Sequence, residues 1–335
     1  MAATIGAIVL AAGKGTRMKS AQAKVLHEVF YRPMLLHVLE AAIAARVERI
    51  TVVLGHQQEA VQAVLSGLPV ETVLQTEQLG TGHAVLCAES ACEGMDQILI
   101  LCGDTPLIQT ETLVAMLAQH QSSQAALTLM TTRLPEPFGY GRILRGKDNQ
   151  VEAIVEEKDA SDEQRGIKEI NAGIYLVDAA FLFSALARVG TNNSQGEVYL
   201  TDIVAIARQE GKKVQAYEHA QSLDVLGVNS RVELAQAEAA LQERRNLELM
   251  RSGVTMLNPQ TTRVAPGCSI AQDCILHGQV SIEGASSLGQ GCIIEQGVVL
   301  RDCRVGAAVR IGAHSALIGR HISDGADIPP LTRHI

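Results

Sequence analysis

From Val264 to Leu300 the sequence reads VAPGCSIAQDCILHGQVSIEGASSLGQGCIIEQGVVL, and an aliphatic residue recurs in it at every sixth position. These aliphatic anchors are Val264, Ile270, Leu276, Ile282, Leu288, Ile294 and Leu300. Neither the period of an α-helix nor that of a strand produces this spacing. A parallel β-helix does, because each short rung turns one aliphatic side chain inward and successive rungs stack these side chains into a core. The stretch therefore predicts a β-helix of hexapeptide repeats.

The repeat continues beyond Leu300 with two slips of one residue. The first slip is followed by anchors at Val305, Ile311 and Leu317, and the second by anchors at Ile322 and Ile328. Mostly small residues stand four positions after an anchor, where they suit tight corners: Cys268, Cys274, Val280, Ser286, Cys292 and Val298. We expect about 75 residues of repeat, or roughly four coils of three rungs each.

A helix and an α/β region precede the repeat. Residues 231–251 are rich in Ala, Gln, Glu and Arg, which favour a long helical arm. Further upstream, β-branched runs alternate with amphipathic stretches. The expected strands are Ile5–Leu10, Arg49–Leu54, Glu71–Leu74, Gln97–Cys102 and Ala125–Thr131. The expected helices are Met34–Ala45, Gln57–Leu65, Gly82–Cys92 and Glu111–Gln121.

This alternation predicts an α/β fold with a Rossmann-like, mainly parallel sheet that is covered on both faces. Ligands of such sheets bind beyond the carboxyl ends of the strands, so residues just after Leu10, Leu74 and Cys102 should share one crevice. Less regular strands around Gly141–Leu144, Val151–Val155 and Glu169–Val177 resemble elements inserted to recognise an acceptor. We divide the chain into a sheet domain (1–229), a connecting arm (230–252) and a β-helix (253–335).

The composition excludes several classes of protein. The chain has a formal net charge of −8, 47% hydrophobic residues and 19% charged residues, which disfavours disorder and binding to nucleic acid or an anionic membrane. Its apolar runs are too short to span a bilayer, and the start lacks the basic region of a signal peptide. Seven scattered cysteines without a CxxC pair favour a reducing cytoplasm over disulfides or zinc.

The first strand leads into a glycine loop, LAAGKGTRM, from Leu10 to Met18. Small residues let backbone N–H groups approach phosphate oxygens, and Arg17 and Lys24 add positive charge. The alternative is a tight turn with solvated basic residues. The loop lacks the Gly-Lys-Ser/Thr of a Walker loop. It also lacks the third glycine of a dinucleotide fingerprint, and no acidic residue follows Leu54-Gly55.

Polar residues also follow the third and fourth strands. The Gln75 amide, with the backbone of Gly80 and Thr81, could read the edge of a base; the alternative is a polar loop that caps the next helix. Asp104, beside Gly103, is well placed to hold Mg²⁺, or it could cap the next element. Because a carboxylate beside a phosphate-binding loop is best explained by a divalent ion between them, we favour the metal.

Three further polar clusters suit sugar hydroxyls: Phe138–Ile143, Glu156–Asp159 and Ile170–Tyr175. Asn229 precedes the long helix, where composition alone favours a cap. Cys102 has no visible partner that would stabilise a thiolate, which indicates a packing role.

These motifs together resemble the bacterial N-acetylglucosamine-1-phosphate uridylyltransferases. The resemblance covers about residues 5–232 in order, and the arm and repeat follow where that family places them. The matching segments are Leu10–Met18, Lys24–His27, Gln75–Ala84, Gly139–Ile143, Glu156–Ala160, Glu169–Gly173, Gln195–Asp202 and Gly227–Arg231. The resemblance implies Mg²⁺-dependent, in-line transfer of a uridylyl group from UTP to N-acetylglucosamine 1-phosphate, with release of pyrophosphate.

The resemblance also implies roles for individual residues. Those implied to bind substrates are Leu10, Ala11, Ala12, Gly13, Lys24, Gln75, Gly80, Thr81, Cys102, Gly103, Asp104, Gly141, Glu156, Asn171 and Asn229. Among them, Gln75, Gly80 and Thr81 would read uracil. Arg17, Lys24 and Asp104 would be catalytic, and Asp104 and Asn229 would hold the Mg²⁺. Cys102 stands where the better-known members have a tyrosine.

The C-terminal region departs from that family. The familiar members are bifunctional, and the later coils of their long left-handed β-helix carry an acetyl-CoA-dependent acetyltransferase site. Because the repeat here is short, we expect a short left-handed β-helix and no acetyltransferase activity. The resemblance also implies a homotrimer formed through the β-helix.

Three alternatives stay open at this point. The first is a related enzyme that uses glucose 1-phosphate or dTTP. The second is an oxidoreductase, which the missing ribose-binding acid disfavours. The third is a non-catalytic trimeric scaffold, which would be expected to lose Lys24, Asp104 or Asn229.

Overall fold

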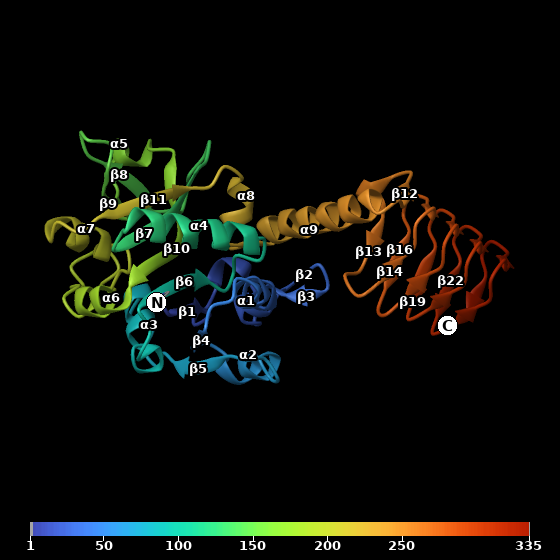
Figure 1. Ribbon diagram of the computed structural model, residues 1–335, viewed down its shortest axis with the longest axis horizontal. Helices are drawn as coiled ribbons and strands as arrows, with labels where there is room; N and C mark the ends of the chain where they lie inside the picture. The colour runs from blue at the N-terminus through green and yellow to red at the C-terminus, as the bar shows by residue number, and fades with distance from the viewer. Residues whose placement is uncertain (1–2, 335) are drawn as a thin grey trace. The chain divides into compact units, whose positions relative to one another are not determined.

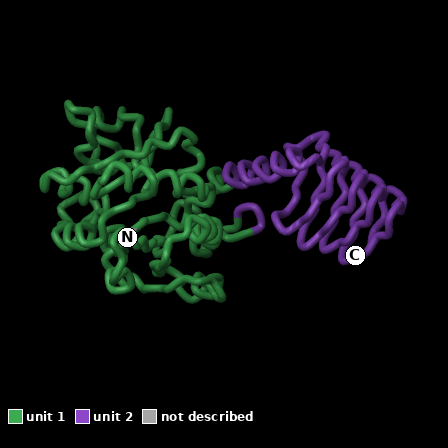
Figure 2. The backbone as a smooth tube through the Cα atoms, viewed as in Figure 1, with its two compact units in different colours: residues 1–28, 32–234 green, residues 29–31, 235–335 purple. Residues whose placement is uncertain are grey.

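The computed structural model describes residues 3–334. The chain folds into two compact units (Figure 2). The first comprises residues 1–28 and 32–234, and the second comprises residues 29–31 and 235–335.

The first unit is built on one large, mainly parallel sheet, as the sequence predicts (Figure 1). Its central strands run in the order β11 (Val214–Glu218), β7 (Leu127–Arg133), β10 (Glu169–Asp178), β6 (Gln97–Cys102), β1 (Ile5–Leu10), β4 (Arg49–Leu54) and β5 (Glu71–Leu74). Strand β1 pairs in parallel with both β4 and β6. Strand β10 is antiparallel to β6 and to β7, and it also carries the hairpin of β8 (Arg142–Arg145) and β9 (Val151–Val155).

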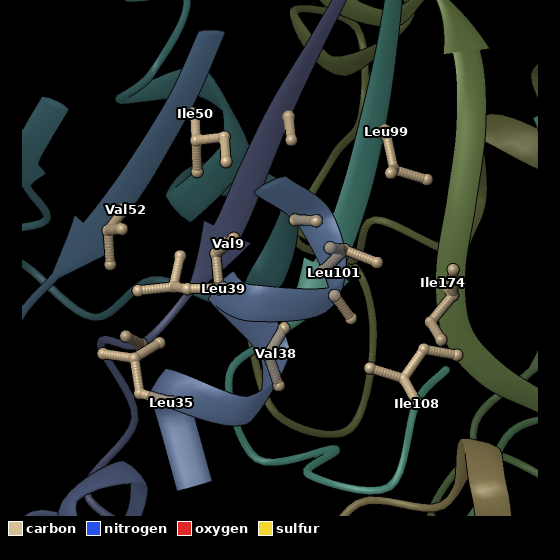
Figure 3. Close-up of a cluster of buried hydrophobic side chains, with 14 of the residues drawn as sticks. Val9, Leu35, Val38, Leu39, Ile50, Val52, Leu99, Leu101, Ile108 and Ile174 are labelled. Carbon is tan, nitrogen blue, oxygen red and sulfur yellow. The ribbon is translucent and has the colours of Figure 1, made fainter. Parts of the chain in front are cut away.

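Helices cover both faces of this sheet because side chains alternate along each strand. In β1, Ala7 and Val9 point into one core, which includes α1 (Met34–Ala44), α2 (Gln58–Val64) and α4 (Thr110–Ser123). Ile8 points into the other core, which includes α3 (Thr81–Leu86), α6 (Ala179–Leu186) and α7 (Asp202–Gln209). Figure 3 shows Leu35, Val38 and Leu39 of α1 lying over the strand residues of the first core. The carboxyl ends of β1, β5 and β6 are thereby held on one rigid frame.

The bounds of several predicted elements differ by one or two residues from those in the structure, and two elements differ most. The helix expected over Gly82–Cys92 ends at Leu86, because the chain continues with hydrogen bonds that span three residues, such as Ala88 N–H to Val85 O, into a 3₁₀ turn at Ser90–Cys92. The strand expected at Ala125–Thr131 is instead Leu127–Arg133, because its pairing with β10 extends to Arg133 and Glu169. Two further α-helices of this unit are the short α5 (Asp162–Arg165) and α8 (Ser222–Val225).

Most of helix α9 (Arg231–Arg251) belongs to the second unit, and it leads into a parallel β-helix. Short strands from β12 (Thr255–Met256) to β25 (Arg333–His334) form three stacked parallel sheets. Residues paired between coils lie 18 positions apart at first, as in Arg263 with Ser281, and 17 apart from Ser287 with Arg304 onward. This change in offset confirms the first predicted slip in the repeat.

The core of the β-helix consists of the predicted anchors. Anchors such as Leu276, Ile294, Leu300 and Ile311 are fully buried, and Ile270 and Ile328 are half-buried. The predicted corner residues, Cys268, Cys274, Val280, Ser286, Cys292 and Val298, are all buried. All seven cysteines are free thiols. Among residues 3–334, no helix has the length and apolar composition needed to cross a bilayer.

Candidate active site

The loop after β1 presents a row of unpaired backbone donors. Its path is held by hydrogen bonds from Ala11 N–H to Val53 O (3.0 Å) and from Gln78 Nε2 to Ala12 O (3.0 Å). Within residues 3–334, the N–H groups of residues 12–15 donate to no acceptor. Successive free N–H groups in a glycine-containing loop form a concavity that suits an anion.

Lys24 lies against this loop because Gly15 leaves room for it. Gly15 has a positive φ of 62°, and a Cβ there would stand 2.5 Å from Lys24 Cβ. The Lys24 ammonium donates to the carboxylate of Asp104 and to the amide oxygen of Asn229. Arg17 Nη2 donates to the same Asn229 Oδ1 at 2.7 Å. The structure therefore brings the two predicted cations onto the two predicted metal ligands.

Asp104 joins three separate segments of chain. Its neighbour Gly103 donates its N–H to Leu10 O (2.9 Å), and its own carbonyl accepts Val228 N–H (2.8 Å). A Cβ at Gly227 would stand 3.1 Å from Asp104 Oδ1, so the loop before α9 packs directly on this carboxylate. In the described part of the chain the Asp104 carboxylate accepts from Lys24 and from no backbone N–H, so it does not cap the next element.

Asn229 does not cap α9 either, because Ser230 and Glu233 do. Glu233 N–H donates to Ser230 Oγ (3.2 Å), and Glu233 Oε2 accepts the N–H groups of Ser230 and Asn229. These bonds form a capping box at the start of the helix. The Asn229 side chain instead donates Nδ2–H to Gly227 O at 2.9 Å, which turns its oxygen toward Lys24 and Arg17.

These two oxygens fit a divalent cation of the hard type. Carboxylate and amide oxygens are suitable ligands, and Mg²⁺ in nucleotide sites is bound by one or two protein groups with substrate phosphates completing its shell. Asp104 Oδ1 has no hydrogen-bond donor within residues 3–334, and Asn229 Oδ1 already faces the cationic groups. Within that range, no group of three or more His, Cys, Asp or Glu side chains is arranged to hold a metal.

Gln75 lies at the end of β5 with its amide fixed in one orientation. The side chain is buried, and Nε2 donates to Gly80 O (3.0 Å). Within residues 3–334, neither Gln75 Oε1 nor the Gly80 N–H has a partner. Gly80 has a φ of 108°, and a Cβ there would stand 2.6 Å from Val198 O. A free acceptor and a free donor therefore belong to two residues joined by a hydrogen bond, and the backbone at Gly80 requires glycine.

The segments described above line one cleft of about 430 Å³, a size typical of ligand sites. The predicted residues that line it are Leu10, Ala11, Ala12, Gly13, Arg17, Lys24, Gln75, Gly80, Thr81, Cys102, Asp104 and Asn229. Gly103 does not line the cleft and instead contributes its hydrogen bond to Leu10. The crevice expected from strand topology is confirmed.

The remaining predicted residues, Gly141, Glu156 and Asn171, gather in a second cluster. Asn171 N–H donates to Gly141 O (2.9 Å), and a Cβ at Gly141 would stand 3.5 Å from both Glu156 carboxylate oxygens. Burial raises the pKa of Glu156, and nearby carboxylates, including Asp159, raise it further. Cys102 connects this cluster to the cleft, because its thiol contacts the Gly173 carbonyl at 3.4 Å. Burial raises the pKa of Cys102 to about 12, which disfavours a thiolate nucleophile.

Three polar residues that line the cleft were missed in the sequence analysis: Thr16, Gln78 and Glu197. Gln78 lies within the matched segment Gln75–Ala84, and its bond to the Ala12 carbonyl has no local sequence signal. Glu197 reaches the cleft because Val198 N–H donates to Leu79 O (2.8 Å) and Val198 O accepts Gly82 N–H (2.8 Å). Such long-range pairing leaves no periodic pattern in the chain.

Comparisons with known proteins agree with this geometry. Residues 7–168 match the MobA-like NTP transferase domain. The chain is 46% identical to the bifunctional protein GlmU of Syntrophotalea carbinolica over 95% of its own length and 68% of that protein. It is 48% identical to GlmU of Geobacter metallireducens (89% of this chain, 63% of that protein) and 45% identical to GlmU of Desulfotalea psychrophila (97% and 96%). The chain is therefore a nucleotidyltransferase, and it belongs to the family of the bifunctional proteins GlmU.

Proposed function

We propose that this nucleotidyltransferase moves the uridylyl group of UTP onto N-acetylglucosamine 1-phosphate, giving UDP-N-acetylglucosamine and pyrophosphate. The observation that carries the proposal is the convergence of Lys24, Asp104 and Asn229 beside the free N–H groups of the first loop. Two anions must meet in this reaction, and the cleft supplies the positive groups that offset their repulsion.

The base would lie against Gln75 and Gly80. Uracil presents an N3–H donor flanked by two carbonyl acceptors. The free Gln75 Oε1 would accept the N3–H, and the free Gly80 N–H would donate to a neighbouring carbonyl. The exposed Thr81, whose Oγ1 is held by Leu200 N–H at 3.2 Å, would border the same base.

Asp104 and Asn229 would hold the metal, which we propose is Mg²⁺. When bound, the ion neutralises phosphate charge and aligns the two reactants. Neither ligand needs a new backbone conformation, because Val228 N–H already fixes Asp104 and Gly227 O already orients the Asn229 amide.

The protein's own groups would then support a direct displacement. An oxygen of the sugar phosphate bonds to the α-phosphorus of UTP while the bond from that phosphorus to the bridging oxygen breaks, and pyrophosphate departs. Lys24 and Arg17 would stabilise the charge that shifts to the phosphoryl oxygens, and the free N–H groups of residues 12–15 would hold the triphosphate. Because the Cys102 thiol stays protonated, no covalent intermediate on it is proposed.

The second cluster would receive the sugar. Gly141, Glu156, Asn171 and Asn229 would contact its hydroxyl and N-acetyl groups, and Cys102 would border the sugar nucleotide beside Gly173. The Glu156 carboxylate is the strongest hydrogen-bond acceptor of this cluster. A related enzyme that uses glucose 1-phosphate or dTTP is the second candidate, because it shares the phosphate and metal groups.

Further properties of the chain belong to the same proposal. We propose the domain division 1–229, 230–252 and 253–335, a cytoplasmic location, and a homotrimer assembled through the β-helix. Multi-angle light scattering tests the trimer.

The experiment that tests the function is release of pyrophosphate from UTP across a panel of sugar 1-phosphates, with and without Mg²⁺. We expect the highest kcat/KM with N-acetylglucosamine 1-phosphate and loss of turnover when the metal is chelated. A higher value with glucose 1-phosphate, or with dTTP in place of UTP, would support the second candidate.

A further inference from the structure

The Gln75 amide is held by a second acceptor that lies outside the cleft. Gly80 O can only accept a hydrogen bond, so the amide atom 3.0 Å from it must be the nitrogen. The same nitrogen lies 3.1 Å from His83 Nδ1. An amide nitrogen donates and does not accept, so His83 Nδ1 is the acceptor and the ring carries its proton on Nε2.

His83 is positioned by the helix that follows the base-reading loop. It lies in α3, half-buried, and its carbonyl accepts the Cys87 N–H at 3.1 Å. The other ring nitrogen, Nε2, faces Cys87 Sγ at 3.9 Å. His83 is not among the residues that line the cleft, so any influence it has on a ligand passes through Gln75.

We propose that His83 is a positioning residue that keeps the Gln75 oxygen turned toward the base and thereby makes the site select uracil over cytosine. This inference rests on the proposed function, in which Gln75 Oε1 accepts the uracil N3–H. Cytosine presents an acceptor at N3, which would face Oε1 and be repelled. If the amide turned over, its nitrogen would face the base and could donate to cytosine N3.

The Gly80 carbonyl alone holds the Gln75 amide less firmly than the Gly80 carbonyl and His83 Nδ1 do together. Gly80 O already accepts the Ala84 N–H at 3.1 Å, so its bond to Gln75 is shared. With His83 present, turning the amide breaks two hydrogen bonds and points Gln75 Oε1 at two acceptors. Without the imidazole acceptor, one of these penalties is lost, which we expect to reduce the preference for UTP over CTP by about tenfold.

The test compares kcat/KM for UTP and CTP in the wild-type protein and three variants. His83→Leu removes the acceptor and keeps an apolar side chain of similar reach. His83→Asn retains an acceptor oxygen near the position of Nδ1. Cys87→Ala removes the thiol on the far side of the ring and leaves Nδ1 in place. Thermal unfolding without substrate checks that each variant is folded.

We expect the UTP/CTP ratio to fall about tenfold in His83→Leu, to recover in His83→Asn, and to stay at the wild-type value in Cys87→Ala. An unchanged ratio in folded His83→Leu would overturn the inference, and so would a ratio that falls equally in Cys87→Ala. If His83→Leu does not fold, the UTP/CTP ratios of His83→Asn and Cys87→Ala decide the question. A lower ratio in Cys87→Ala would then overturn the inference. Failure of the wild-type protein to use UTP would instead reject the proposed function.

Discussion

Lys24 and Asp104 lie 80 positions apart in sequence, yet the ammonium of one donates to the carboxylate of the other at the edge of the same cleft. Both side chains are largely shielded from solvent, with 12% and 20% of their surface exposed. Such partial burial strengthens the attraction of the Lys24 ammonium for phosphates and of the Asp104 carboxylate for a metal ion. The pair is therefore the point at which the proposed phosphate-binding loop and the proposed metal ligand meet.

Replacing either member of this pair with alanine should lower kcat for pyrophosphate release by about 100-fold or more, because each would act on charge that shifts in the transition state. Lys14→Ala is the matched control, since Lys14 belongs to the same loop but is exposed. Circular dichroism spectra should remain those of the folded protein. Turnover near the wild-type level in Lys24→Ala or Asp104→Ala would show that these groups are not catalytic.

Gly80 provides a test of the base site through the backbone. Gly80→Ala would bring a Cβ within 2.6 Å of Val198 O at a φ of 108°, so both the fold and the position of the Gly80 N–H should suffer. We expect KM for UTP to rise and the free energy of unfolding to fall by roughly 2 kcal/mol or more. Gly196→Ala is the control, because Gly196 also has a positive φ (67°) but open space around it. Denaturant titrations that give equal losses for the two variants would contradict the proposed clash.

Local sequence patterns predicted much of the fold because the burial of each aliphatic anchor follows from its position in the hexapeptide repeat. Leu276 and Ile294 are buried where the six-residue period requires it, and the slip after Leu300 appears as the shorter offset between Ser287 and Arg304. The direction of β10 could not be predicted in this way. A strand buried between neighbours has the same apolar sequence whether it runs parallel or antiparallel.

In the candidate site, too, features that depend on neighbouring residues in the sequence could be predicted, whereas features that depend on long-range contacts could not. The glycine loop and Asp104 could be placed at strand ends from the sequence, since strand ends are local features. The position of Glu197 depends on the pairing of Val198 with Leu79, and the amide orientation of Asn229 depends on Gly227 O. Contacts of this kind become visible only when the chain has folded.

Glu233 should influence metal binding through the backbone of Asn229. Its carboxylate accepts the Asn229 N–H as well as the Ser230 N–H. Glu233→Ala should therefore raise the Mg²⁺ concentration that gives half-maximal turnover, whereas Ser230→Ala loses only the Oγ bond to Glu233 N–H and should leave it unchanged. Each variant should lose about 1 kcal/mol of stability from the helix cap. Equal Mg²⁺ requirements in the two variants would show that Glu233 acts only as a cap.

Cys102→Ser should retain kcat within a few-fold of wild type. Burial raises the pKa of the thiol to about 12, so it remains protonated at neutral pH and cannot act as the nucleophile. Peptide mapping by mass spectrometry should also show that iodoacetamide modifies Cys102 slowly in the folded protein. A loss of turnover of several hundredfold in the serine variant would contradict a passive role for this thiol.

Glu156 should make binding of the sugar phosphate depend on pH. Burial, reinforced by Asp159, Asp202 and Glu197, raises the pKa of its carboxyl above the ordinary glutamic acid value. As the pH falls through that raised pKa, the carboxylate becomes protonated and can no longer accept hydrogen bonds from the sugar as an anion. KM for the sugar 1-phosphate should therefore begin to increase at a higher pH than it would with a glutamate of ordinary pKa. Glu156→Gln should bind the sugar less tightly at neutral pH and should lack this part of the pH dependence. Titration of the phosphate group affects both proteins alike, so the difference between their KM profiles isolates Glu156. Parallel profiles for the two proteins would place the titrating group elsewhere.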